Sequence, residues 1–569
     1  MVSRDLDGLS TWPTRAQLRP GEPLELIVRA SHPGPVSIRV FDGVALVTET
    51  EVAVDGGERT VRLPLAAAAR AGYGIEVTSS GGRATTAIDI APHWSTAPRY
   101  GFFSDFGPDE AEADSADRAD ALLRLHVNVV QFYDWMASHH TLVSETDEFT
   151  DPLGRRLSHI VGRRKVDLVH KRGMAALGYG ALYGAEADFS LERPDWLLYD
   201  GRRQPLTLAQ IFYLQDFSTQ SPWRNWIQAQ YEHAVDSLDF DGIHIDQYGF
   251  PKRALSRASG SWRDLDIGAE FPSFVEEACQ RILARRPDGG SIFNCVNAWP
   301  LDAMPAVDSD AATYIEVWEP HSRYRDLYDL VRRARTLRSD KAVILAAYLS
   351  PFSPERPRTA GALTTFRLAS AAIGASGGFH LIAGEGNALL TEAYYPRYGR
   401  LDATETDIVR RYADFSVRNT TRLHDIASTD IAWTHVGPTN DLITLEHPSL
   451  GWYGAGAMAD SLWVVGRESG AVTVLQFVNL RGLVSESWNV EQSTAPAPLD
   501  DVELRVRVTA GVRGVWWDTP DDENGLARAL PYDVVDESDG RFLVARLPRI
   551  DVWSSVWWEL DGPRPEVLA

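Results

Sequence analysis

Two acidic residues stand at the ends of short apolar segments, where a strand could present a reactive side chain. Asp246 ends the segment GIHID, and Glu316 ends the segment TYIE. In an extended strand Ile243 and Ile245 share one face, and Asp246 lies with His244 on the other. Cleavage of a glycosidic bond requires two such carboxylates, because one attacks the anomeric carbon while the other protonates the leaving oxygen. This pair is therefore the leading candidate for catalysis.

Other residues with suitable chemistry are weaker candidates. Glu319 has the opposite strand alternation to Glu316. Asp241 lies at the start of its strand, and residues at that end of a barrel serve stability. His139 and His140 are adjacent, but their spacing matches no metal motif, so we expect neither a metal nor an organic cofactor. The alternative reading of the two strand-end acids is that they only bind loop amides or an ion.

The elements that must position the two acids alternate between apolar strands and helical stretches, which is typical of a parallel sheet. Eight such strands, each preceded by a helix, close most economically into a (β/α)8 TIM barrel with the active site at the carboxyl ends of its strands. The candidate strands are YGFFSDF from Tyr100, VNVVQFYDW from Val127, AALGYGAL from Ala175, GIHIDQYG from Gly242, SIFNCVNA from Ser291, AATYIEVW from Ala311, AVILAAYLS from Ala342 and GGFHLIAGE from Gly377.

Short alternating runs separated by Gly-rich and Pro-rich turns flank this central region. From Gly21 to Ile90 they predict an immunoglobulin-like β-sandwich, and after Leu423 they predict a second β-sandwich of Greek-key type. We expect a multidomain protein with domains at 1–96, 97–425 and 426–569.

The charge of the chain excludes several classes of partner. The formal net charge is −23, which would repel nucleic acid and anionic lipid surfaces but not a neutral sugar. The chain has 18 Trp and 19 Tyr, whose flat rings suit stacking on sugars. At the predicted strand ends these are Tyr133, Trp135, Trp299 and Trp318.

Cysteine content and hydropathy say little about function. Cys279 and Cys295 are the only cysteines, and we expect both to be free thiols. No run of 18 apolar residues predicts a membrane span, and no signal peptide is visible. The expected location is cytoplasmic, or secreted if this sequence is a trimmed mature form.

Four segments together resemble glycoside hydrolase family 66, the dextranases and cycloisomaltooligosaccharide glucanotransferases. They are LHVNVVQFYDWMASHH from Leu125, FDGIHIDQYG from Phe240, YIEVWEP from Tyr314 and GGFHLIAGEGNALLTEAYYP from Gly377. The resemblance implies a retaining mechanism with Asp246 as nucleophile and Glu316 as acid/base. Because Glu316 must carry a proton when the leaving oxygen departs, we expect its pKa to exceed that of Asp246.

The same resemblance implies a set of residues that bind the sugar near the two acids. They are Tyr133, Asp134, His140, Asn297, Trp318, Glu385 and Asn387. The implied substrate is an α-1,6-linked glucan, either dextran or an isomaltooligosaccharide.

One departure from the family bears on the reaction. Glucanotransferase members carry an inserted carbohydrate-binding domain in the seventh barrel unit, whereas here the chain runs directly from Tyr348 to Thr364. We therefore expect hydrolysis, with transfer to give cyclic or elongated isomaltooligosaccharides as the alternative. A non-catalytic carbohydrate-binding protein is a third hypothesis, which the presence of both acids disfavours. The sequence predicts no oligomeric state.

Overall fold

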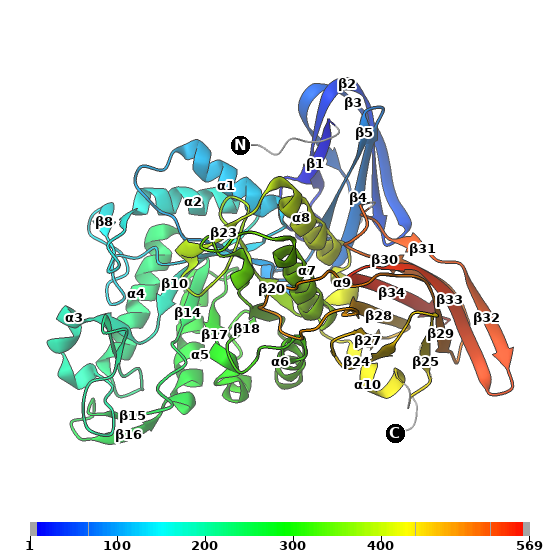
Figure 1. The fold of residues 1–569 in the computed structure, drawn as a ribbon. Coiled ribbons are helices and arrows are strands. Elements are labelled where there is room, and N and C mark those ends of the chain that lie inside the picture. Colours follow the sequence, from blue (N-terminus) through cyan, green and yellow to red (C-terminus); the bar gives the residue numbers. More distant parts are fainter. Residues whose placement is uncertain (1–7, 66–67, 438–439, 524, 562–569) are drawn as a thin grey trace.

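The computed structural model describes residues 8–65, 68–437, 440–523 and 525–561. Figure 1 shows a central sheet with surrounding helices, an N-terminal sheet against one side of it, and C-terminal sheets beside both. None of the helices in the described ranges is both long and apolar enough to span a bilayer.

Residues 9–90 form one connected antiparallel sheet, whereas the sequence predicted the two stacked sheets of an immunoglobulin-like sandwich. Its strands are β1 (Leu9–Pro13), β2 (Leu24–Asp42), β3 (Ala45–Leu63), β4 (Ala71–Ser79) and β5 (Gly82–Ile90). The long strand β2 shifts register between Ala30 and Pro33, and it pairs with β1 before this point and with β4 after it. An isolated bridge joins Leu18, which follows β1, to Ile90 at the end of β5. The sheet therefore curls around its own apolar core.

The eight predicted central segments all form strands, and each pairs in parallel with the next along the chain. They are β6 (Tyr100–Phe103), β7 (Val129–Phe132), β10 (Ala175–Ala181), β14 (Gly242–Asp246), β17 (Ile292–Asn294), β18 (Thr313–Glu316), β19 (Val343–Ala346) and β20 (Phe379–Leu381). One residue beyond β20, β21 (Ala383–Gly384) pairs in parallel with β6. The sheet is therefore strongly curled, and its last segment returns to its first. β22 (Ala388–Leu389) and β23 (Gly399–Arg400) extend it at β21.

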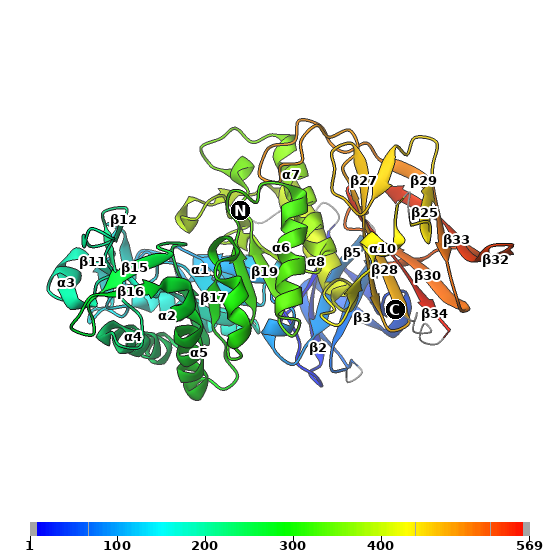
Figure 2. The same ribbon diagram turned by 90° about the horizontal axis from the view of Figure 1, so that it is seen from below.

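Helices cover the outside of this curled sheet (Figure 2). They are α1 (Glu112–Arg124), α2 (His159–Lys171), α4 (Pro222–Leu238), α5 (Ile267–Arg285), α6 (Tyr324–Leu337), α7 (Ala360–Ala375) and α8 (Ala403–Arg418), followed by the short α9 (Thr420–Leu423). Ser158 and Ser221 cap α2 and α4 by accepting hydrogen bonds from backbone N–H groups of the first turn.

The sequence predicted a helix before every strand, and two strands depart from this pattern. Before β6 the described chain forms only the 3-10 turn η1 (Trp94–Thr96). Between β17 and β18 the described chain forms only short 3-10 turns, η3 (Val296–Ala298) and η4 (Leu301–Ala306). Pro300 and Pro305 account for the difference, because proline lacks the N–H that a continuing α-helix needs.

Strand alternation separates the inner and outer faces of the curled sheet as the sequence analysis predicted. Ile243, Ile245 and Ile315 pack in the apolar cluster that includes the helices. Tyr314 packs in a second cluster with residues of the other strands, such as Tyr100. The interior of the sheet is therefore rich in tyrosine.

Long connections after β7, β10 and β14 form a lobe at the end of the molecule opposite the C-terminal sheets (Figure 2). They contain β8 (Glu148–Thr150), β9 (Arg156–Ser158), β11 (Gly184–Glu186), α3 (Ala187–Leu191), η2 (Pro194–Trp196), β12 (Thr207–Leu208), β13 (Phe212–Leu214), β15 (Arg253–Ser256) and β16 (Arg263–Asp266).

The C-terminal residues form two sheets that share one apolar core, as expected for a β-sandwich. The larger sheet contains β24 (Thr429–Asp430), β26 (Trp452–Gly454), β27 (Ser461–Ser469), β28 (Val472–Asn479), β30 (Val512–Asp518), β31 (Arg528–Ala529) and β34 (Trp553–Leu560). The smaller sheet contains β25 (Ile443–Glu446), β29 (Leu499–Arg507), β32 (Tyr532–Glu537) and β33 (Gly540–Ile550), and α10 (Ala432–His435) lies before them.

Buried ion pairs join the three parts of the chain. Arg99, just before β6, contacts Asp89 of β5 at 2.8 Å. Arg418 at the end of α8 forms two hydrogen bonds of 2.7 and 2.8 Å with Asp518 of β30. Because these side chains are nearly inaccessible to solvent, the pairs fix both flanking parts against the central one.

Candidate active site

The two predicted catalytic acids lie at the carboxyl ends of β14 and β18, with the end of β17 between them. Asn294 ends β17, and its amide nitrogen contacts Asp246 Oδ1 at 2.7 Å and Glu316 Oε2 at 3.0 Å. One nitrogen atom thus bridges both carboxylates. The structure thus places the two acids at the ends of two strands that are separated by β17, and their catalytic roles stay a prediction.

Two tyrosines complete the contacts of the carboxylates. The Tyr179 hydroxyl donates to Asp246 Oδ2 at 2.8 Å, and the Tyr348 hydroxyl donates to Glu316 Oε1 at 2.7 Å. The sequence analysis assigned no role to these tyrosines or to Asn294. The alternation of Tyr179 with Gly178 and Gly180 in β10 was an available signal, because both glycines face packed aromatic rings and leave Tyr179 on the inner face.

Burial dominates the electrostatics of Asp246. Burial, followed by the neighbouring charge of Glu316, raises the pKa of Asp246 to about 7, and the hydrogen bonds from Asn294 and Tyr179 lower it only in part. The expected order of the two acids, with the higher pKa at Glu316, stays a prediction. The raised pKa of Asp246 means that the unliganded pair retains a proton near neutral pH.

Asp134 follows β7 in the left-handed backbone region, with φ of 49°. Its nearest cation is Arg155, whose Nη2 lies 3.7 Å from Asp134 Oδ2. Burial raises the pKa of Asp134 to about 6, although the charges of His139 and Arg155 oppose this. A carboxylate with so few strong contacts has capacity to accept hydrogen bonds from a ligand.

Aromatic side chains surround the carboxylates. Tyr133 stacks on Tyr395 with ring centres 4.3 Å apart. Trp318 is 42% exposed, and its ring centre lies 5.7 Å from that of Tyr348. Trp318 thus presents an exposed ring face, whereas Tyr395 covers one face of Tyr133.

Two other predicted ring faces are not free. Trp135 is only 2% exposed and donates through Nε1 to the backbone oxygen of Tyr179, so it supports the strand. The Lys252 ammonium lies 3.4 Å from the ring centre of Trp299, which covers that ring.

The adjacent histidines form a cluster around one acid that the sequence analysis did not select. His139 Nδ1 lies 3.1 Å from Glu186 Oε1, and His140 Nδ1 lies 2.5 Å from Glu186 Oε2. These hydrogen bonds hold the pKa of Glu186 well below its usual range, although its burial opposes them. Among the described residues no group of three or more His, Cys, Asp or Glu is arranged to hold a metal ion.

The two predicted asparagines occupy strained loop positions. Asn297, with φ of 54°, donates to the backbone oxygen of Glu319 and accepts from the backbone N–H of Trp318. Its amide therefore orients the loop that carries Trp318. Asn387, with φ of 57°, lies in the turn between β21 and β22.

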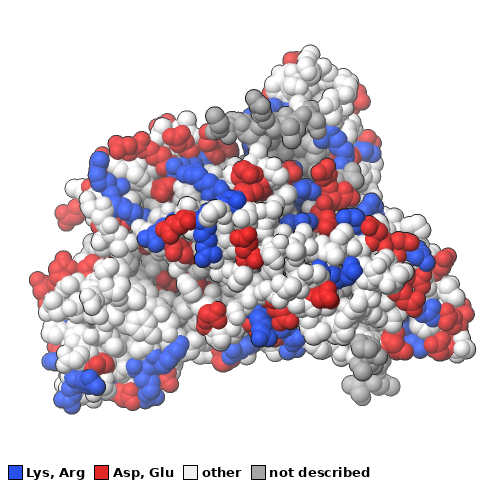
Figure 3. Space-filling model, in the orientation of Figure 1, with Lys and Arg blue, Asp and Glu red and all other residues white. Residues whose placement is uncertain are grey.

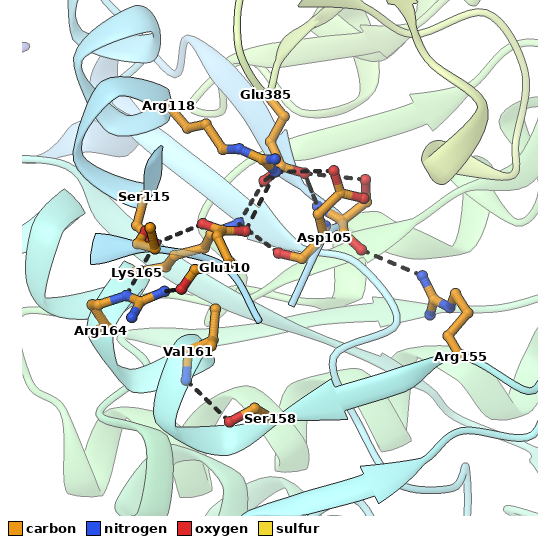
Figure 4. Close-up of polar contacts among 12 residues, drawn as sticks. Asp105, Glu110, Ser115, Arg118, Arg155, Ser158, Val161, Arg164, Lys165 and Glu385 are labelled. Atoms are coloured by element: carbon orange, nitrogen blue, oxygen red, sulfur yellow. Dashed lines mark hydrogen bonds and ion pairs between the residues drawn. The ribbon is translucent and has the colours of Figure 1, made fainter. Parts of the chain in front are cut away.

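Glu385 is fully buried and does not join the carboxylate pair. Its carboxylate contacts Lys165 Nζ at 2.6 Å and Arg118 Nη1 at 2.9 Å (Figure 4). It also accepts hydrogen bonds from the backbone N–H groups of Ser104 and Asp105. These contacts tie the end of the curled sheet to α1 and α2. The structure thus places Glu385 in a supporting network behind the site, where the sequence analysis expected a contact with sugar.

Two carboxylates at the carboxyl ends of a curled parallel sheet, lined by aromatic rings, are typical of glycosidases. The family model of glycosyl hydrolase family 66 matches residues 37–557. The chain therefore belongs to glycosyl hydrolase family 66.

Three similar proteins carry related names. Two cycloisomaltooligosaccharide glucanotransferases of Niallia circulans are each 28% identical over 300 residues, which cover 49% of this chain and 31% and 30% of theirs. The match thus spans about a third of the length of these curated relatives. A solved structure of a cycloisomaltooligosaccharide glucanotransferase from Paenibacillus sp., complexed with cycloisomaltoheptaose, has a TM-score of 0.86 and 20% identity. That match covers 96% of this chain and 100% of the other, and it shows that the two share a fold.

Proposed function

We propose that this protein is a retaining enzyme that cleaves α-1,6-linked glucans, with Asp246 as nucleophile and Glu316 as acid/base. The bridging amide of Asn294 carries the proposal. Two oxygens held by one nitrogen are no farther apart than the sum of its two hydrogen bonds. This upper bound applies to the two nearest oxygens. It lies below the separation of about 6.5–9.5 Å that inverting enzymes use, so it favours the closer spacing of about 5–5.5 Å in retaining enzymes.

The proposed reaction proceeds in two displacements. Asp246 attacks the anomeric carbon and forms a glycosyl ester while Glu316 transfers its proton to the leaving oxygen. Glu316 then takes a proton from the incoming hydroxyl, which attacks the same carbon and releases Asp246. Tyr179 and Asn294 hold the Asp246 carboxylate in place, and Asp134 accepts hydrogen bonds from sugar hydroxyls.

The incoming hydroxyl decides between the two candidate activities. The names of the relatives support transfer to a sugar hydroxyl, which would yield cyclic or elongated isomaltooligosaccharides. The direct chain from Tyr348 to Thr364 favours water, which would yield hydrolysis. Of the two, transfer has the stronger support from the comparisons.

We also infer that the curled parallel sheet is a (β/α)8 barrel. The pairing of β21 with β6 supports closure, and the turns η3 and η4 take the place of one helix. Acidic and basic side chains are interspersed on the surface around it (Figure 3), so the face shown carries no continuous basic patch for a polyanion.

Incubation with isomaltooligosaccharides and dextran tests the proposal. By NMR we expect the first product to have the α configuration. Chromatography should show cyclic or longer products if the enzyme transfers, and shorter glucose-ended fragments if it hydrolyses. The variant Asp246→Asn should lose activity by roughly three orders of magnitude or more, and azide should restore turnover with a glycosyl azide of inverted configuration. A β product released first, or Asp246→Asn activity within about tenfold of the parent, would exclude this mechanism.

A further inference from the structure

A cavity of about 350 Å³ lies where three parts of the chain meet. Its walls come from the β2–β3 turn at 42–45, from the segment 421–428 that includes α9, and from the outer face of the larger C-terminal sheet. None of the residues that line it belongs to the carboxylate site. Its volume falls within the range of about 300–1,000 Å³ that is usual for small-molecule sites.

Two adjacent strands each contain two consecutive tryptophans, and one tryptophan from each strand lies in the floor of this cavity. Trp517 of β30 and Trp558 of β34 face the core of the sandwich, where they are nearly inaccessible. Trp516 and Trp557 are directly paired across the same strands and point to the opposite face. Their rings stack with centres 6.1 Å apart and planes 22° apart. The inner tryptophans pack in the core of the sandwich. Of the outer two, Trp557 is itself only 3% exposed and lies beneath Arg422, so Trp516, which is half-buried, is the one whose ring needs a separate explanation.

The outer tryptophans continue a row across the sheet. Arg467 pairs with Val474, and Val474 pairs with Trp557. In the next row Gly514 leaves space for the Trp516 ring, because a Cβ at Gly514 would lie 2.5 Å from a ring atom. The floor is therefore aromatic and apolar with Arg467 at one end, and Trp516 is its partly exposed ring.

Polar groups from the other two walls converge on this floor. The Arg422 guanidinium lies 4.6 Å from the ring centre of Trp557, and its Nη2 contacts Asp42 Oδ1 at 3.1 Å. Arg422 Nη1 is buried without a hydrogen-bond partner among the described residues. Gly43 has φ of 56°, and a Cβ there would come within 3.0 Å of Arg422 Nη2. The turn thus fits closely over the arginine, which is held against Trp557 and Asp42.

The charges around the cavity select the class of ligand. Four acids, namely Asp42, Asp425, Glu468 and Glu559, surround the two arginines Arg422 and Arg467. This excess of negative charge disfavours phosphates and carboxylates. Stacked rings beside arginine and carboxylate groups instead match a sugar, which offers a flat apolar ring face and hydroxyls that both donate and accept.

We propose that this cavity is a second carbohydrate-binding site, which holds a short stretch of neutral α-glucan away from the reacting bond. The choice of a glucan rests on the proposed function. The arguments from stacking and charge, which indicate a neutral saccharide, are independent of it. Binding there would keep a polymer on the enzyme between successive reactions.

Binding measurements in the Asp246→Asn background test this site, because that variant holds substrate without turnover. Titration calorimetry with isomaltoheptaose should give two sites per chain, and Trp516→Ala should leave one. Dextran in a native gel should slow the migration of the parent. Trp516→Ala should lower the apparent affinity for dextran by about tenfold, and Trp516→Phe should keep most of that affinity. The matched control is Trp452→Ala, which removes a 41% exposed indole from the same sheet outside the cavity.

The outcomes separate this site from the proposed function. One site per chain in the Asp246→Asn parent, or an equal loss in Trp516→Ala and Trp452→Ala at unchanged thermal stability, would overturn the second site. Cleavage of isomaltooligosaccharides by the unmodified enzyme would uphold the proposed function in either case. If the enzyme cleaves no isomaltooligosaccharide but its retardation by dextran depends on Trp516, the second site is upheld and the proposed function is rejected.

Discussion

Asn294 contacts both acids through one nitrogen atom, and this contact ties their protonation together. Two carboxylates that interact so closely lose their protons in two steps that belong to the pair. With the pKa of Asp246 raised to about 7, the singly protonated pair extends close to neutral pH. A retaining mechanism needs Asp246 ionised for attack, so its raised pKa places the onset of activity near neutral pH.

The hydroxyl of Tyr179 lowers the pKa of Asp246, so its removal should raise that pKa further. Because Asp246 must be ionised to attack, the rise of kcat/KM with pH should move to higher pH in Tyr179→Phe, by about one unit. The measurement is a pH profile of kcat/KM. Tyr199→Phe is the control, because its hydroxyl binds the backbone oxygen of Pro194 outside the site. An unshifted profile in Tyr179→Phe would contradict the assigned contact.

Glu316 should matter most when the leaving oxygen needs a proton. Glu316→Gln should therefore slow natural glucans by roughly two to four orders of magnitude and slow substrates with activated leaving groups far less. Rates for both substrate types, measured side by side, check this. Glu319→Gln, an acid of opposite strand alternation, serves as the control and should change neither rate strongly. Equal losses on both substrates would argue against an acid role for Glu316.

At the scale of elements, close contact between sheet and helices decides which side chains reach the interior. In β10, a Cβ at Gly178 would lie 2.7 Å from the ring of Phe240, and one at Gly180 would lie 2.6 Å from the ring of Tyr231. Glycine lets these rings pack against the strand. Tyr179 is thereby held between them with its hydroxyl at the carboxylate pair.

The network around Glu385 should support the edge of the sheet more than the chemistry. Glu385→Gln leaves Lys165 and Arg118 with an incomplete partner, and loss of a buried ion pair costs about 3–5 kcal/mol. Denaturant unfolding should show this loss. Glu148→Gln, which removes an exposed ion pair with Arg156, should cost less than about 1 kcal/mol. Similar values for the two variants would be inconsistent with a supporting role.

At the scale of the whole molecule, α8 connects all three parts. It packs on β4 and β5, and its last residue, Arg418, pairs with Asp518 of β30. Asn419 donates a further hydrogen bond to the same carboxylate. Since these groups are buried, the C-terminal sandwich cannot separate without exposing them.

Asp518→Ala should therefore loosen the sandwich from the centre of the molecule. We expect one calorimetric unfolding transition in the parent, and in the variant an earlier transition for the C-terminal sheets, because Arg418 is left buried and unpaired. Asp536→Ala breaks an exposed pair with Arg541 and should leave the thermogram unchanged. A single, unshifted transition in Asp518→Ala would show that the junction does not depend on this pair.

The sequence by itself determined the eight central strands, the C-terminal strands and the orientation of Asp246 and Glu316. These features depend on local periodicity, because residues two apart in a strand share a face wherever the strand lies. The same local signal failed between β17 and β18, where two prolines interrupt the helix.

Only the tertiary structure decided which side chains meet. Nothing within a single strand could show that Asn294 bridges both acids, that Glu385 is buried between Lys165 and Arg118, or that Trp135 supports a neighbouring strand. The curl of the N-terminal sheet and the cavity above Trp516 likewise arise where distant segments pack together. Such contacts depend on the register and packing of elements far apart in the chain, which local residue patterns do not encode.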